Sequence, residues 1–144
     1  MVEIRQFNAD KHWDEVKSWW DSSGYPVPAL TLLPEDTTFI GEVNGENAYC
    51  WTLLLTNSCE VALLENFVKN PKVKLSLKES TDVVKAMLEY AQGVASKMGY
   101  RRLLCINERP ELKRYYPRIG FKYVTDVAIF VKDVEPKEKL ENGH

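Results

Sequence analysis

The sequence predicts an α+β fold: a central mixed, mostly antiparallel sheet of six to seven strands with helices on both faces. Two observations indicate it. Asn44-Gly45 lies between two apolar runs, which is a strong hairpin signal. A long amphipathic stripe, from about Thr81 to Met98, joins two further apolar runs. A strand–helix–strand unit of this length places its two strands parallel.

Turn and cap residues separate the expected elements. Asn8 or Asp10 can cap a first helix, Gly99 can end the long helix, and Pro110 to Gly120 predicts a short helix. The expected strands are Val2 to Phe7, Thr38 to Val43, Asn47 to Leu55, Cys59 to Val68, Leu103 to Asn107, and Phe121 to Val131 as one strand or a bent pair.

Composition limits the class of protein. A chain of 144 residues with 44% hydrophobic residues can form one core, and we expect a domain over residues 1–132 and a charged flexible tail over 133–144. The net charge of -2 argues against nucleic acid as a partner. No apolar run reaches the roughly 18 residues of a membrane-spanning helix. Three cysteines within predicted strands indicate reduced, buried thiols in a cytoplasm, and two histidines make a metal site improbable.

The first helix and the loop after it allow two interpretations. Trp13, Val16 and Trp20 share one helical face, which indicates core packing or an indole lining a substrate cleft. Ser22 to Asp36 contains Gly24 and three prolines, and we expect a lid or substrate-side segment with at most a short helical turn.

The segment N-E-R-P-E-L-K-R-Y-Y-P-R-I-G-F, at residues 107–121, resembles a pattern of the GCN5-related N-acetyltransferase superfamily, and the order of elements over about Val2 to Val131 is similar too. Trp20, Gly24, Leu33 and Pro34 resemble a subset common in bacteriophage genomes. The resemblance implies that acetyl-CoA binds where the fourth and fifth strands splay apart.

The resemblance also implies roles for single residues. The backbone of Asn66, Phe67 and Val68 would pair with the pantetheine arm, and Asn107 would contact the cofactor. Tyr116, rather than its neighbour Tyr115, would protonate the leaving thiolate. A phenol suits this role because its pKa near 10 keeps it protonated at neutral pH.

A general base is expected to be a carboxylate acting through water. Glu65 on the fourth strand is the first candidate and Glu108 the second. Both carboxylates can equally be solvated charges at strand ends.

The phosphate-binding loop of this family would fall on residues 79–84, where the pattern is degenerate. Glu79 replaces a basic residue, and Asp82 and Val84 replace glycines. Two interpretations stay open. Ser80, Thr81, Asp82, Val83 and Val84 can bind the phosphates with help from five nearby lysines, or Ser80 is only a helix cap and the lysines are solvated.

Two functions follow from the resemblance. The first is acetyl-CoA-dependent, direct N-acetylation of a small-molecule amine or a protein amino group. The alternative is a catalytically weak or inactive protein of the same fold that binds a protein partner or another acyl carrier. A homodimer stays open in both cases.

Overall fold

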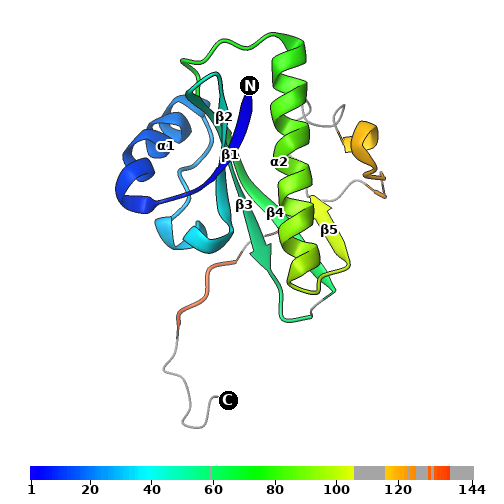
Figure 1. Cartoon of the computed structure of the whole chain (residues 1–144). Coiled ribbons are helices and arrows are strands. Elements are labelled where there is room, and N and C mark those ends of the chain that lie inside the picture. Colours follow the sequence, from blue (N-terminus) through cyan, green and yellow to red (C-terminus); the bar gives the residue numbers. More distant parts are fainter. Residues whose placement is uncertain (59, 106–115, 123, 126–129, 131, 137–144) are drawn as a thin grey trace.

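The computed structural model describes residues 1–58, 60–105, 116–122, 124–125, 130 and 132–136. Its elements are β1 (Val2–Gln6), α1 (Ala9–Ser23), the 3-10 turns η1 (Leu30–Leu32) and η2 (Glu35–Thr37), β2 (Thr38–Val43), β3 (Glu46–Leu55), β4 (Val61–Lys69), α2 (Leu77–Lys97), β5 (Arg102–Cys105) and η4 (Tyr116–Ile119). The strands form one sheet in the order β1-β2-β3-β4-β5 (Figure 1). β1 to β4 are antiparallel neighbours, and β4 and β5 are parallel. The predicted mixed sheet with one parallel pair is confirmed.

The β2–β3 hairpin turns where the sequence predicted it. Asn44 and Gly45 have φ values of 51° and 85°. A two-residue turn of this kind needs positive φ at both positions, and Asn-Gly adopts it at low cost. The hairpin makes β3 a central strand, and it is buried without interruption from Ala48 to Leu53.

Alternate residues of the strands face two different helices. Phe39 and Trp51 belong to the core cluster that α2 covers, whereas Ile40 and Cys50 belong to the cluster that α1 covers. Successive side chains of a strand point to opposite faces, so the two helices lie on opposite sides of the sheet (Figure 1). Helices on both faces are therefore confirmed.

The tryptophans of α1 are core residues. Trp19 and Trp20 are buried, and Trp13 packs against the same cluster. Of the two interpretations of this helix, the structure supports packing. The loop after α1 contains η1 and η2, two short turns where at most one was expected.

The helix α2 begins earlier than predicted. It starts at Leu77, and its N-cap is Ser76 rather than Ser80 or Thr81. The Ser76 hydroxyl accepts a hydrogen bond from the Glu79 amide at 3.1 Å, and the Glu79 carboxylate accepts one from the Ser76 amide at 2.9 Å. This reciprocal pair is a capping box. The prediction failed because the apolar stripe starts only where the helix reaches the core at Val83, about two turns after the cap.

We expect Ser76→Ala to lower the free energy of unfolding by about 1 kcal/mol, because the change removes the acceptor for the Glu79 amide. Ser80→Ala serves as the matched control, since position 80 lies inside the helix. Urea denaturation of both variants measures the difference. Equal destabilisation by the two changes would contradict the observed start of the helix.

Several expectations concern residues outside the described part. The predicted strand over Phe121 to Val131 and the start of the short helix at Pro110 fall largely there, so the sixth and seventh strands stay predictions. The boundary between domain and tail near residue 132 is likewise a prediction. Among the described residues, no helix is both long and apolar enough to span a membrane.

Candidate functional site at the end of the parallel strand pair

β4 runs past the end of its pairing with β5. Four residue pairs join Val61–Leu64 to Arg102–Cys105, and β4 then continues to Lys69. Beyond Leu64, this edge of β4 has no partner strand within the described ranges. A free strand edge offers main-chain donors and acceptors to an extended ligand. The three residues expected to pair with a cofactor arm, Asn66, Phe67 and Val68, lie on it.

A β-bulge distorts the same segment. The register of β3 and β4 shifts between Cys50 and Thr52, so that Asn66 and Phe67 both face Trp51. Asn66 has a φ of 58°, a left-handed conformation that asparagine tolerates better than most residues. A bulge leaves one residue out of the ladder. It therefore releases main-chain groups of β4 next to the unpaired edge.

The side chains of Phe67 and Val68 belong to the core. The Phe67 ring stacks on Tyr49, with centroids 5.1 Å apart, and meets the edge of Trp51 at 4.6 Å. Val68 is fully buried. Both residues can therefore offer a ligand only their main chain.

Tyr116 lies against the C-terminal end of β5. It opens η4, and the Phe121 amide donates to the Tyr116 carbonyl at 2.9 Å. The two rings also touch, with centroids 5.4 Å apart. The Tyr116 hydroxyl shares a hydrogen bond with the thiol of Cys105, the last described residue of β5.

The environment keeps both of these groups protonated. Burial raises the pKa of Tyr116 above its ordinary value, and the neighbouring Cys105 and Glu65 raise it further. Burial also raises the pKa of the Cys105 thiol to about 12; the hydrogen bond from Tyr116 lowers it and the charge of Glu65 raises it. At neutral pH the phenol therefore has a proton to give, with Glu65 close enough to affect it.

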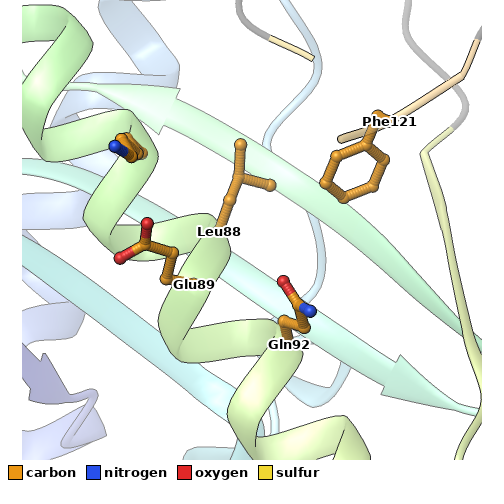
Figure 2. A pocket seen from close by; sticks show the side chains of 5 residues that line it. Leu88, Glu89, Gln92 and Phe121 are labelled. Atoms are coloured by element: carbon orange, nitrogen blue, oxygen red, sulfur yellow. The ribbon is translucent and has the colours of Figure 1, made fainter. Parts of the chain in front are cut away.

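A small pocket opens beside this cluster, between α2 and Phe121. Figure 2 shows the Phe121 ring facing the α2 side chains across it. Its volume is about 100 Å³, and its lining includes Lys85, Leu88, Glu89, Gln92 and Phe121. A whole drug-sized ligand needs roughly 300 Å³ or more. The pocket thus has room for part of a ligand beside Phe121, whose ring contacts Tyr116.

The predicted phosphate-binding residues do not form a loop. Ser80 to Val84 lie within α2, where main-chain amides belong to the helical ladder. Val83 and Val84 are buried in the core. The amide of Glu79 is occupied by Ser76. The expected cradle of amides over Thr81 to Val84 is therefore absent, because the capping box extends the helix through this region.

Exposed lysines surround the start of α2 instead. Asn70 holds the preceding loop, since its side chain donates to the Asn47 carbonyl at 2.8 Å and accepts from the Lys72 amide at 3.0 Å. Lys69, Lys72 and Lys74 are exposed there. Lys78 pairs with Asp82 at 2.8 Å, so its charge is largely compensated.

The structure brings together only part of the predicted site. Glu65, the bulge and Tyr116 lie at the same end of the parallel pair, whereas Asn107 and Glu108 lie outside the described residues. Sequence reasoning did not assign Cys105 to the site. A cysteine in a short apolar strand indicates a core residue. Its contact with Tyr116 depends on the tertiary structure.

The fold is similar to that of solved acetyltransferases. The aminoglycoside N-acetyltransferase AAC(6')-Iy, in complex with the bisubstrate analogue CoA-S-monomethyl-acetylneamine, has a TM-score of 0.63 and 21% identity; the match covers 93% of this chain and 99% of that chain. Glucosamine-6-phosphate N-acetyltransferase from Arabidopsis thaliana gives a TM-score of 0.64 and 11% identity, over 92% of this chain and 99% of that chain. An acetyltransferase from Trypanosoma brucei has a TM-score of 0.63 and 11% identity; the match covers 92% of this chain and 100% of that chain. No family model and no curated protein matches the sequence. At these identities the likeness shows the fold.

Proposed function

We propose that this chain, which has the fold of the GCN5-related N-acetyltransferases, transfers the acetyl group of acetyl-CoA directly to an amino group. One observation carries the proposal: a protonated phenol, that of Tyr116, is held at the point where β4 leaves β5 and exposes a bulged edge. The solved structures of the same fold include complexes with CoA and with a CoA-containing analogue, which supports the choice of donor.

The proposed reaction uses the groups at this edge. The amine nitrogen attacks the thioester carbon, and the oxygen that becomes negative is stabilised by a main-chain amide released by the β4 bulge. The carbon–sulfur bond then breaks, and the CoA sulfur takes the proton of Tyr116. Glu65 accepts the proton of the amine, directly or through water, and solvent restores both residues.

The phosphates of the donor are proposed to lie near the lysines rather than in an amide cradle. The helix start is capped by its own side chains, and Glu79 and Asp82 place negative charge there. Lys69 at the end of β4, with Lys72 and Lys74 in the loop that leads to α2, supplies exposed positive charge. Point charges of this kind bind phosphate without a glycine loop.

We expect the triple change of Lys69, Lys72 and Lys74 to glutamine to weaken acetyl-CoA binding about tenfold at low salt, because each exposed pair contributes up to about 1 kcal/mol. The loss should shrink at about 0.5 M salt, where exposed charges are screened. Calorimetric titration of acetyl-CoA at both salt concentrations measures it.

A matched control separates local from overall charge. Changing the exposed Lys11, Lys17 and Lys97 of the two helices to glutamine removes the same net charge. This control should bind acetyl-CoA as the wild type does. Equal weakening in both triple variants would contradict a phosphate site at Lys69, Lys72 and Lys74, on the connection from β4 to α2 that we call the lysine loop.

The experiment that tests the function itself is an acetyl-transfer assay. The wild-type protein is incubated with acetyl-CoA and a panel of amines: neamine, glucosamine 6-phosphate, and a peptide with a free α-amine and a lysine. Release of free CoA thiol that depends on one of these amines supports the proposal. No heat on titration with millimolar acetyl-CoA would overturn it.

A second candidate is a weak or inactive protein of this fold that binds a protein partner or another acyl carrier. The capping box of Ser76 and Glu79 favours it, because it occupies the helix start that would otherwise face phosphates. Binding of an acyl pantetheine without phosphates at the same affinity as acetyl-CoA would support this candidate.

A further inference from the structure

Asn66 joins the β4 bulge to a distant loop. Its side-chain nitrogen Nδ2 donates a hydrogen bond of 2.9 Å to the carbonyl oxygen of Leu32, 34 residues earlier in the chain. Leu32 ends η1. The next residue, Leu33, is buried in the cluster that α1 covers. Two consecutive residues thus attach this loop to the strand and to the core.

The loop lies on the opposite side of the sheet from the pocket. Leu33 belongs to the core on the α1 side, whereas Leu88 and Gln92 of α2 line the pocket. The lysine loop leads into α2. A donor whose phosphates lie at the lysines enters from the α2 side. An amine that meets its acetyl group at the bulge must then arrive on the side of the loop.

The backbone of Asn66 and its side chain therefore serve different purposes. The backbone at a φ of 58° maintains the bulge. The side-chain amide holds the loop at a defined distance from the bulge. Exposed apolar side chains on this loop, Leu30 and Leu32, are available to contact an arriving substrate.

We propose that Asn66 is a positioning residue that fixes the η1 loop against the β4 bulge and so sets the geometry of the acceptor side of the site. The statement that this side of the site receives the acceptor amine rests on the proposed function. The attachment of the loop itself rests only on the contacts of Asn66.

Three substitutions separate the two purposes. Asn66→Gly keeps a positive φ and removes the side chain. Asn66→Asp keeps size and tolerance of this conformation, but its carboxylate cannot donate to the Leu32 carbonyl. Asn66→Ala removes the hydrogen bond and also disfavours the bulge conformation.

Steady-state kinetics with the panel amine that the wild type acetylates fastest give the first readout. Asn66→Gly and Asn66→Asp should raise the KM for the amine about fivefold, the equivalent of one lost hydrogen bond, and leave the KM for acetyl-CoA within about twofold. Asn66→Ala should change both constants. An unchanged amine KM in the glycine and aspartate variants would overturn the proposal, as would an equal rise in both constants.

Hydrogen exchange gives a readout that does not depend on activity. The amides of residues 30–33 and 35–37 should exchange about fivefold faster in Asn66→Gly than in the wild type, while those of α2 stay unchanged. Unchanged exchange in the loop would overturn the proposal. A wild type that acetylates no amine would instead overturn the proposed function, and the exchange experiment would still decide whether Asn66 holds the loop.

Discussion

Replacing Tyr116 by phenylalanine is expected to lower kcat about 100- to 1,000-fold, the usual cost of losing a general acid. The change removes only the hydroxyl, which shares a hydrogen bond with Cys105 in the free protein and is proposed to donate to the CoA sulfur during reaction. The ring and its contact with Phe121 remain. The affinity for acetyl-CoA, measured by calorimetry, should therefore change little.

Tyr90→Phe provides the matched control. Tyr90 lies on α2, and its ring packs against Phe39 at 5.2 Å, away from η4. The control should retain wild-type kcat. If Tyr116→Phe retained kcat within about threefold of the wild type, its role as acid would be wrong.

The pH dependence follows from the direction of the pKa shift. Because the pKa of Tyr116 is raised, the phenol stays protonated above pH 10, the ordinary value for tyrosine. Activity should thus rise with pH while the substrate amine loses its proton, without a falling limb from Tyr116 below pH 10. The same rise at much lower rate is expected for Tyr116→Phe.

Gly41→Ala is expected to lower the free energy of unfolding by about 1–3 kcal/mol. A Cβ at position 41 would lie 2.6 Å from the Met87 sulfur and 2.8 Å from Cγ2 of Val83. Both partners are buried on α2, and the valine side chain has few alternative rotamers. The helix would have to move away from β2. Urea denaturation measures the loss.

Gly93→Ala is expected to raise the free energy of unfolding, although it is the same chemical change as Gly41→Ala. Gly93 lies within α2, and a Cβ there meets no atom within 4 Å. Alanine should stabilise the helix by roughly 0.5–1 kcal/mol.

The contact at Gly41 can be tested with a double variant. Gly41→Ala combined with Val83→Ala should be less destabilised than the sum of the two single changes, because Val83→Ala removes one clash. Full additivity would contradict direct contact between β2 and α2 at Gly41.

Much of the fold was predictable because its signals are local. Asn44-Gly45 specified the hairpin, and Gly99, with a φ of 87°, follows the end of α2 as expected. The apolar stripe of α2 predicted its buried face, where Val84, Met87 and Leu88 pack against the sheet. Periodicity of this kind reports which face of an element is buried.

The start of α2 was not predictable from that stripe. Its first turn is exposed or half-buried, and its position depends on the hydrogen bonds between Ser76 and Glu79. The sequence S-L-K-E does contain a capping box, which was the signal to use. The error mattered, because it shifted the expected phosphate site into the helix.

The sequence by itself determined the hairpin and the parallel pair of strands, because both follow from short-range patterns of polarity and turn residues. The choice of Tyr116 as the acid came from the resemblance to a known family. Only the tertiary structure decided that Tyr116 meets Cys105 and Glu65, that Asn66 holds Leu32, and that the start of α2 is closed by its own cap. Such contacts join residues far apart in the chain, and their geometry depends on how the whole sheet twists and packs.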